Sequence, residues 1–311
     1  MHWFAKAPSN IALIKYMGKL DTEQNIPMNP SLSYTLNNLV THVELEAHNG
    51  NEDLWKSLSS DFTLTPTAQH RFLKHLARLK GWANYSGAFI VRSSNNFPLG
   101  SGLASSASSF AALTQCAIAA LCEITDRPIP SIATQASLSR AGSGSSCRSF
   151  FSPWALWDGE TVTATTLPYD TLLHQAIVIS HGEKKVSSSE AHIRIKSSPL
   201  YATRSTRATE RLHLLLNAFS TRNWLKIYQL CWDEFQDLHQ LFATASAPFS
   251  YITPACEAIL SSVQQLWQQN HDGPIVTMDA GPNIHLLYRP DQARLAERFK
   301  CDQLVGRYDV L

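Results

Sequence analysis

The chain carries almost no net charge and lacks the common metal and redox signatures. Its 26 basic and 25 acidic residues leave a formal charge of +1, which argues against a general nucleic-acid-binding surface. Its 6 cysteines include no C-x-x-C pair, so a zinc ribbon or a redox motif is not expected. Buried, reduced thiols in a cytoplasmic protein are the simplest interpretation.

Long hydrophobic runs are missing as well. The N-terminal residues have no basic segment that leads into an apolar run, which argues against a secretory signal. The longest apolar stretch, around Phe110–Cys122, is too short and too interrupted to span a bilayer. We therefore expect no part of the chain to lie in a membrane.

Two familiar phosphate-binding loops are also absent. The G-x-x-x-x-G-K-[ST] loop requires a lysine after its glycines, and none follows Gly100 and Gly102. The G-x-G-x-x-G fingerprint is broken too, because Leu103-Ala104-Ser105 follows the second glycine. Neither a P-loop fold nor a dinucleotide-binding fold is supported.

The chain has enough apolar residues for a substantial core. Its 311 residues, 44% of them hydrophobic, predict roughly two domains or one large one. The periodicity predicts strands at 10–14, 33–47 (a hairpin turning at Asn37-Asn38), 88–91, 154–157, 175–180, 275–278 and 284–288, and helices at 66–83, 102–124, 131–141, 203–243 (broken near 221–223) and 253–270. This order favours an α+β protein. A Ser/Lys-rich region at 181–200 predicts a boundary between domains 1–183 and 184–311.

A loop rich in glycine and serine leads into an alanine-rich segment within Asn95–Leu113. Glycines let the main chain approach an anion closely, and the next helical turn offers free N–H groups and the positive end of its dipole. The hydroxyls of Ser105, Ser106, Ser108 and Ser109 add donors, or ligands for a phosphate-bound metal. The pattern predicts a phosphate site; a flexible connector before an ordinary helix is the alternative.

Two further segments place cations beside hydroxyls. A predicted strand ends with Lys15, Tyr16 and Lys19 around a glycine, which suits a phosphate but also a solvated turn. Gly142–Ser149 combines two glycines, four serine hydroxyls and Arg148. An arginine fork grips a carboxylate or a phosphate at two points, and this loop is hard to explain by packing alone.

Two motifs in the second half complete the pattern. Lys184–Ser189 sets two lysines beside three serines, which either close over an anion or lie in water, and the local sequence slightly favours water. Asp279–Asn283 offers a carboxylate before a tight turn, which fits an ordinary turn or a group aimed at a reacting hydroxyl. Together these segments suggest a phosphorylated substrate and a nucleotide, since phosphoryl transfer depends on positioning and charge stabilisation.

On these segments the chain resembles the mevalonate diphosphate decarboxylases of the GHMP kinase superfamily. The matching stretches follow the family order over most of the chain: APSNIALIKYMGK at 7–19, PMNPSLSYTL at 27–36, NNFPLGSGLASSASSFAAL at 95–113, RAGSGSSCRS at 140–149, KKVSSS at 184–189 and DAGPN at 279–283. Their combination separates this family from the simple GHMP kinases.

The resemblance implies a GHMP kinase-type α+β fold with the active site between two domains. Residues 1–183 would form the ATP- and substrate-binding domain, like domain 2 of ribosomal protein S5 and with an unusual βαβ crossover, and 184–311 a ferredoxin-like domain. The implied enzyme is an ATP-dependent carboxy-lyase of isoprenoid biosynthesis. It phosphorylates the 3-hydroxyl of (R)-mevalonate 5-diphosphate and releases phosphate and CO2, which leaves isopentenyl diphosphate. Mg2+ is expected with ATP, through ligands that the sequence does not identify, and a homodimer is the common state of the family.

The resemblance also implies roles for individual residues. Asp279 matches the essential aspartate beside the 3-hydroxyl, and Asn10 and Lys15 match residues that support it and the substrate oxygens. Arg148 matches the arginine on the substrate carboxylate, where its benefit is alignment, since a salt bridge to a leaving carboxylate stabilises the ground state. The expected substrate contacts are Tyr16, Lys19, Ser143, Gly144, Ser145, Arg148 and Ser188, and the expected nucleotide contacts are Pro98, Gly100, Gly102, Leu103, Ala104, Ser105, Ser106, Ser108 and Lys184.

Three positions depart from the family pattern. Met17 stands where the family often has tryptophan, Ser189 where bacterial relatives often have arginine, and Ala191-His192 where many members have Gly-Met. The last two concern the loop that closes over ATP. His192 is most simply a loop histidine, with a nucleotide contact as the alternative.

Three rival functions are weighed against this one. A sister enzyme would decarboxylate mevalonate 5-phosphate or phosphorylate the 3-hydroxyl without decarboxylation, but Asp279, Arg148 and Lys19 favour the diphosphate. A silent nucleotide-binding protein would be expected to lose the aspartate or the glycine-rich loop, and both are present. A GHMP enzyme acting on a sugar is disfavoured by the GSGSSCRS loop.

Overall fold

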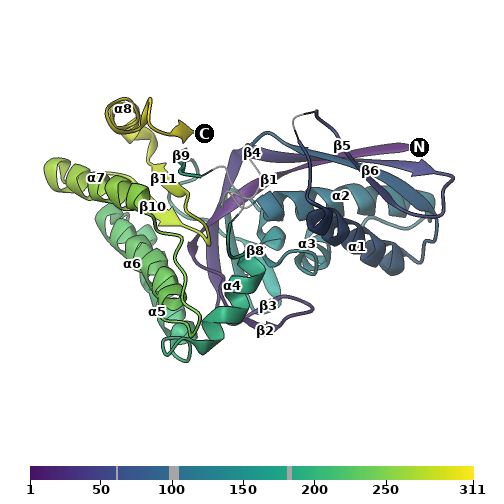
Figure 1. Ribbon diagram of the computed structural model, residues 1–311, viewed down its shortest axis with the longest axis horizontal. Coiled ribbons are helices and arrows are strands. Elements are labelled where there is room, and N and C mark those ends of the chain that lie inside the picture. Colours follow the sequence, from purple (N-terminus) through teal and green to yellow (C-terminus); the bar gives the residue numbers. More distant parts are fainter. Residues whose placement is uncertain (61, 98–104, 181–183) are drawn as a thin grey trace.

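The computed structural model describes residues 1–60, 62–97, 105–180 and 184–311 (Figure 1). The strands are β1 (His2–Ile14), β2 (Lys19–Asp21), β3 (Ile26–Pro27), β4 (Ser31–His48), β5 (Leu54–Ser57), β6 (Ala88–Asn95), β7 (Trp154–Asp158), β8 (Thr161–Ala164), β9 (Leu173–Val178), β10 (Ile275–Met278), β11 (Ile284–Tyr288) and β12 (Asp309–Val310). The α-helices are α1 (Pro66–Ala83), α2 (Ser105–Ile124), α3 (Ile132–Arg140), α4 (Ser188–Arg194), α5 (Arg204–Ser220), α6 (Trp224–Ala243), α7 (Pro254–Asn270) and α8 (Ala293–Phe299), and a 3-10 helix, η1, spans Gly144–Phe150.

The long strand β4 organises the larger sheet. The strand order is β5-β6-β4-β7-β8, and β1 lies antiparallel along β4, from His2 opposite Glu46 to Ile14 opposite Leu32. β6 pairs with the C-terminal half of β4 and β7 with its N-terminal half. Helices α1 and α2 cover one face of this sheet (Figure 1).

β5, α1 and β6 form the expected βαβ crossover. β5 and β6 are parallel neighbours, with Leu54 opposite Ile90. The helix between them begins where the sequence predicts, because Thr65 accepts a hydrogen bond from the Ala68 amide at 3.3 Å and a proline occupies the first turn. It ends at Asn84, whose φ of 56° is left-handed.

The predicted hairpin at Asn37-Asn38 is wrong. β4 is continuous through these residues, which are exposed. Its register against β1 shifts there, since Pro8 lies opposite Val40 and Ser9 opposite Leu36. The surplus residues of β4 form a bulge, which uses the same small polar residues as a turn.

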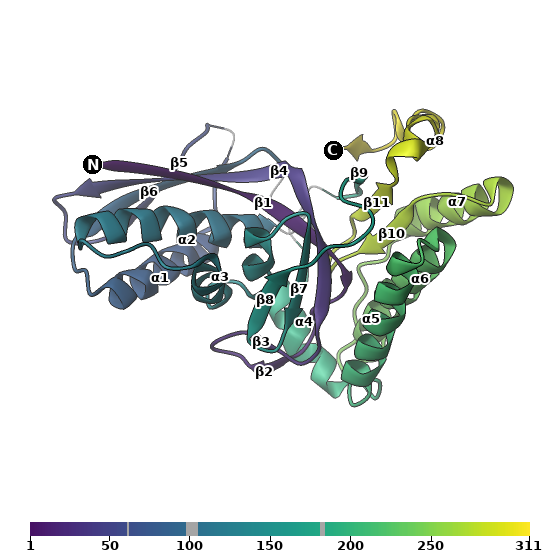
Figure 2. The ribbon, with the colours of Figure 1, turned by 180° about the vertical axis from the view of Figure 1, so that it is seen from behind.

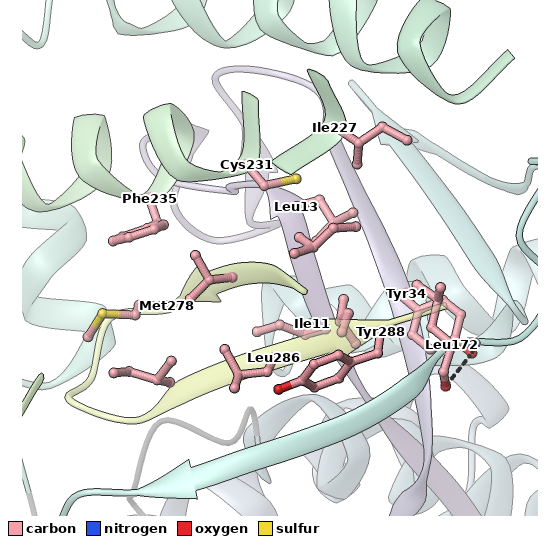
Figure 3. Packing of buried hydrophobic residues seen from close by; sticks show 14 of the residues in the cluster. Ile11, Leu13, Tyr34, Leu172, Ile227, Cys231, Phe235, Met278, Leu286 and Tyr288 are labelled. Atoms are coloured by element: carbon pink, nitrogen blue, oxygen red, sulfur yellow. Dashed lines mark hydrogen bonds between the residues drawn. The ribbon is translucent and has the colours of Figure 1, made fainter. Parts of the chain in front are cut away.

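The smaller sheet has the order β10-β11-β9-β12, and α5, α6 and α7 lie beside it (Figure 1). Figure 3 shows Ile227, Cys231 and Phe235 of α6 facing this sheet and the end of β1. β1 is shared between two cores. Its early residues Trp3 and Ala7 pack with α1 and α2. Its later residues Ile11, Leu13 and Ile14 pack with α6 and the small sheet.

Helix α2 is a core element. It is long and apolar enough to cross a membrane by length and composition, but 72% of its most apolar window is buried inside the protein. Seen from behind, α1 and α2 lie on the same side of the large sheet, with α3 and the β7–β8 pair toward the centre of the molecule (Figure 2).

The α+β class is confirmed, and so are the helices predicted at 66–83, 131–141 and 253–270 and the pair within 203–243. The helix predicted at 102–124 is confirmed from Ser105 onward, and its first three residues lie outside the described part of the chain. α4 was not predicted. The division of the chain at residue 183 stays a prediction.

Candidate active site

A cleft of about 680 Å³ opens where the end of β1 meets both halves of the molecule. Segments far apart in sequence line it, from the β1–β2 turn, α1, α2, η1 and α4 to the end of β10. The lining residues are Ala12, Lys15, Tyr16, Met17, Lys19, Asn25, Thr63, Leu64, Thr65, Thr67, Ala68, Arg71, Phe72, Ser93, Ser105, Ser106, Ser109, Phe110, Gly142, Ser143, Gly144, Ser145, Arg148, Lys184, Ser187, Ser188, Ser189, His192, Leu238, Asp279 and Ala280.

The described lining of this cleft is strongly cationic. Lys15, Lys19, Arg71, Arg148 and Lys184 contribute positive charge, and Asp279 contributes the one carboxylate. Hydroxyl groups fill most of the remaining polar positions. Such an excess of cations and hydroxyl donors in a concave site suits a ligand with several negative charges.

Lys15 and Asp279 form an ion pair at the centre of the cleft. The Lys15 Nζ lies 2.6 Å from the Asp279 Oδ1, and their side chains are 3% and 25% exposed. Burial lowers the pKa of Lys15, which the negative charge of Asp279 opposes. Burial alone would raise the pKa of Asp279, but the charge and hydrogen bond of Lys15 hold it below the usual value. The pair therefore presents a carboxylate rather than a carboxylic acid.

Arg148 lies beside this pair and is 4% exposed. Its Nε donates to the Asn10 Oδ1 at 3.0 Å, and its Nη1 donates to the Ser31 Oγ at 2.8 Å. Trp157 packs against the guanidinium, whose Cζ lies 5.8 Å from the ring centroid. These contacts fix the plane of the fork, so it meets a ligand in one orientation.

Asn10 supports Arg148 from behind the cleft. Its Nδ2 donates to the Ser149 Oγ at 2.8 Å and to the Ser145 carbonyl at 3.2 Å. It is not among the described lining residues, and its hydrogen bonds lead to η1 and Arg148 rather than to Asp279. The amide is thus placed to position the arginine, whereas the sequence pattern implied support for the aspartate.

The residues expected to bind the substrate diphosphate come together. Tyr16, Lys19 and Ser143–Ser145 all line the cleft. The Lys19 Nζ donates to the Asn25 Oδ1 at 2.6 Å, which anchors the lysine. Gly144 lies against Tyr16 so closely that an added Cβ would be 2.6 Å from the tyrosine ring. A side chain at this position would therefore displace Tyr16 from the wall of the cleft.

The predicted nucleotide loop is only partly described. Pro98, Gly100, Gly102, Leu103 and Ala104 lie outside the described residues. Of the three predicted serines, Ser105 and Ser106 lie at the start of α2 and line the cleft.

Ser108 does not face the cleft, contrary to its prediction as a nucleotide contact. It is fully buried, and its hydroxyl lies 2.7 Å from the Thr41 Oγ1 on β4. Helical geometry turns it away, and its neighbour Ser109 lines the cleft instead.

Lys184 and Ser188 also reach the cleft. The Lys184 Nζ donates to the Ala280 carbonyl at 2.5 Å and to the Ser188 Oγ at 3.3 Å. The solvated loop that the local sequence favoured is wrong for this lysine, because burial lowers its pKa and it lies over the ring of Tyr251. The serines begin α4, with Ser187 as the N-cap that accepts from the Glu190 amide at 3.1 Å.

Sequence reasoning missed one wall of the cleft. This wall comes from the segment before α1, from α1 and from β6, and its residues are Thr63, Thr65, Thr67, Arg71 and Ser93. Arg71 extends over the Phe110 ring, with its Cζ 5.7 Å from the centroid. A helical arginine with this spacing resembles an ordinary surface residue, so no local pattern pointed to a role in the cleft.

A second buried ion cluster braces the end of β1. Arg204 of α5 and Glu234 of α6 are both fully buried and bonded to each other through two pairs of atoms. The Lys15 backbone amide donates to the Glu234 Oε1 at 2.9 Å. Arg207, Arg211 and Asp237 complete the cluster. Glu234 thus fixes the main chain of the lysine that pairs with Asp279.

The protein has an α+β fold of the GHMP kinase type, with a cationic, hydroxyl-rich cleft that residues of both cores line. Comparison with known proteins gives the family. Residues 7–168 match the diphosphomevalonate decarboxylase-like N-terminal domain, and residues 176–300 match the mevalonate 5-diphosphate decarboxylase C-terminal domain. The chain belongs to the diphosphomevalonate decarboxylase family.

Individual relatives agree with this assignment. A mevalonate diphosphate decarboxylase from Legionella pneumophila is 59% identical, with 100% of both chains covered and a TM-score of 0.95. The diphosphomevalonate decarboxylase of Gibberella zeae is 30% identical over 92% of this chain and 81% of its own. A solved structure of MDDEF in complex with MVAPP, AMPPCP and magnesium is 29% identical, covers 100% of this chain and 96% of its own, and has a TM-score of 0.86.

Proposed function

We propose that the protein catalyses the ATP-dependent decarboxylation of (R)-mevalonate 5-diphosphate to isopentenyl diphosphate. The observation that carries this proposal is the convergence of Asp279, Lys15 and Arg148 with two hydroxyl-rich segments in one cationic cleft. The family and the ligand set of the MDDEF structure support it.

The substrate spans the cleft from its carboxylate to its diphosphate. The fixed fork of Arg148 receives the carboxylate, while Lys19, Tyr16 and Ser143–Ser145 receive the diphosphate. Ser188 and Lys184 close the site near the phosphates. Clamping both ends leaves the tertiary 3-hydroxyl near the central carboxylate, which is alignment of the kind that lowers an entropic barrier.

Asp279 is the group that faces the 3-hydroxyl. As the hydroxyl oxygen attacks the γ-phosphorus of ATP, its proton passes to the carboxylate, early or late, and ADP leaves. The C3–O bond of the phosphorylated intermediate then breaks with the electron pair going to phosphate. The bond between C2 and the carboxylate carbon breaks as well, its electrons form the new C2=C3 double bond, and CO2 departs. Lys15 keeps Asp279 anionic before the transfer.

ATP binds along the remaining wall of the cleft, which threonines and serines of α1, β6 and the start of α2 line. Arg71 and the hydroxyls of Ser105, Ser106 and Ser109 lie there. Among the described residues, no group of three His, Cys, Asp or Glu side chains could hold a metal ion. Mg2+ commonly binds through substrate phosphates and one or two protein oxygens, so Asp279 and these serines fit an ion that arrives with the nucleotide. When bound, it neutralises charge on the β- and γ-phosphates.

The surroundings of the enzyme are part of the proposal. The described cysteines are free thiols, and five of them are buried, which suits a reducing, cytoplasmic compartment. The state expected from the family resemblance is a homodimer, and light scattering of the purified protein measures this directly. A monomeric mass would remove the dimer from the proposal.

The decisive assay measures two products at once. Mevalonate, its 5-phosphate and its 5-diphosphate are each incubated with ATP and Mg2+, and both ADP and CO2 are quantified. Equal amounts of ADP and CO2 from the diphosphate alone are expected. ADP without CO2 would convert the assignment to a 3-kinase, and CO2 from the 5-phosphate would convert it to the monophosphate decarboxylase.

A further inference from the structure

His192 lies where α4 meets the turn after β1. It is 8% exposed, yet its ring lines the cleft next to Tyr16 and Lys19. The backbone amide of Gly18 donates to its Nδ1 at 3.0 Å. The ring packs on Tyr16 with centroids 4.7 Å apart. The histidine is thus part of the cleft wall and not a residue of a solvated loop.

These contacts determine which ring nitrogen carries the proton. Burial, with Lys19 and Lys196 nearby, lowers the pKa of His192 to about 3, so the ring is neutral near pH 7. A neutral imidazole has one donor and one acceptor. Because Gly18 uses Nδ1 as the acceptor, Nε2 carries the hydrogen and is the donor that the ring can offer to a ligand.

We propose that His192 is a specificity-determining residue that donates its Nε2–H to the distal phosphate of the substrate, beside Lys19 and Tyr16. The inference rests on the proposed function, since it takes this end of the cleft as the diphosphate subsite. Lys19 supplies a point charge, whereas the imidazole N–H has a fixed direction. A monophosphate would leave this donor without its partner, and an unmet donor in a closed site costs affinity.

A purely structural role for His192 makes a different prediction. The Gly18 bond alone would tie α4 to the β1–β2 turn, where the φ of Gly18 is +99° and an added Cβ would be 3.0 Å from Met28. In that case the Nδ1 acceptor matters and the Nε2 donor does not. Two amide variants separate these roles, because asparagine places its oxygen near the Nδ1 position and glutamine places its nitrogen near the Nε2 position.

The first experiment compares His192→Asn with His192→Gln in steady-state kinetics. We expect His192→Asn to raise the KM for mevalonate 5-diphosphate about tenfold, as for the loss of one charge-assisted hydrogen bond, with kcat and the KM for ATP within about twofold of wild type. His192→Gln should stay within about threefold in all three constants. A wild-type KM in His192→Asn, or equal losses in both variants, would overturn the proposal.

A second experiment needs no turnover. Calorimetric titration with inorganic pyrophosphate and with inorganic phosphate gives a ratio of affinities for wild type and both variants. The ratio should fall in His192→Asn and be retained in His192→Gln, and an unchanged ratio in His192→Asn contradicts the assignment. If wild type releases no CO2 from mevalonate 5-diphosphate, the proposed function fails while this ratio still tests His192.

Discussion

Two ion pairs contact Lys15, one through its side chain and one through its backbone amide, and they differ in whether a carboxylate oxygen stays available to a ligand. In the first, the Lys15 side chain meets Asp279, whose carboxylate still lines the cleft. In the second, both oxygens of Glu234 are taken, one by Arg204 and the Lys15 amide and the other by Arg204 and Arg211. Side-chain exposure is 3% and 25% in the first pair and 0% for both partners in the second.

The comparison separates a reactive pair from a supporting one. A carboxylate with a face toward the cleft can accept a proton or orient a hydroxyl, whereas one surrounded by donors can only hold its neighbours in place. Breaking a buried pair leaves an uncompensated charge, so both should be sensitive to substitution. Substitution of Asp279 should lower the activity of the enzyme, whereas substitution of Glu234 should lower its stability.

The largest effect is expected at Asp279. Asp279→Asn keeps the shape of the side chain and removes the proton acceptor, so we expect kcat to fall about a thousandfold or more. The coupled ADP and CO2 assay measures this. Binding of a non-hydrolysable ATP analogue serves as the control for an intact cleft, and turnover near that of wild type would refute the role of Asp279.

Glu234→Gln should lower stability rather than chemistry. The uncharged amide leaves only Asp237 to balance the positive charges of Arg204 and Arg211, so the free energy of unfolding should fall by about 3 kcal/mol. Urea denaturation measures this. If the folded variant loses kcat as severely as Asp279→Asn while its stability is unchanged, the distinction between the two pairs is wrong.

Arg148→Lys tests the fork between these extremes. Lysine keeps the charge but cannot hold both Asn10 and Ser31 while gripping a carboxylate, so the substrate is misplaced. We expect kcat/KM for mevalonate 5-diphosphate to fall about 100-fold. The KM for ATP, measured in the same experiment, should change little, and wild-type kcat/KM would show that the fork is not needed.

The pH dependence of anion binding tests the buried lysines of the cleft. Burial lowers the pKa of Lys15, Lys19 and Lys184 below the ordinary value of 10.5. Each lowered pKa means that the cation is lost as the pH rises through a value below 10.5, and with it a contact to phosphate. Calorimetry should therefore show pyrophosphate affinity falling with a midpoint below pH 10.5, and a midpoint at or above pH 10.5 would contradict the lowered pKa values of these lysines.

The smallest effect is expected for an exposed pair. Arg92 and Glu46 lie 2.8 Å apart across the large sheet, and the side chain of Glu46 is 43% exposed. Glu46→Gln should leave the midpoint of urea denaturation close to that of wild type, because an exposed ion pair contributes little to stability. It is the matched control for Glu234→Gln in the same urea series, and equal losses in the two would show that burial does not set the cost.

Much of this architecture could be predicted from local signals. Thr65-Pro66 marks the start of α1, and the apolar spacing gives the long helices. The segments that carry Lys15, Arg148 and Asp279 could be recognised as anion-binding or acidic motifs, and the fold places them in one cleft.

The remainder depends on tertiary contacts that no local pattern reveals. Three successive serines have low helix propensity, so α4 was not predicted, although Ser187 caps it. Arg204 and Glu234 read as ordinary charged residues on amphipathic helices until α5 and α6 pack on β1. Ser108 and Ser109 are adjacent serines, so the sequence does not distinguish them. The orientation of α2 buries Ser108 and turns Ser109 toward the cleft.

The pairing of Lys15 with Asp279 also bears on how the enzyme is made. The two residues are separated by 264 positions along the chain. During synthesis the ribosome releases the lysine early, and its carboxylate partner emerges only after β10 has been translated. A nascent or prematurely terminated chain therefore holds phosphate-binding segments without the acidic group, so it cannot consume ATP on this substrate before the nearly complete polypeptide has folded.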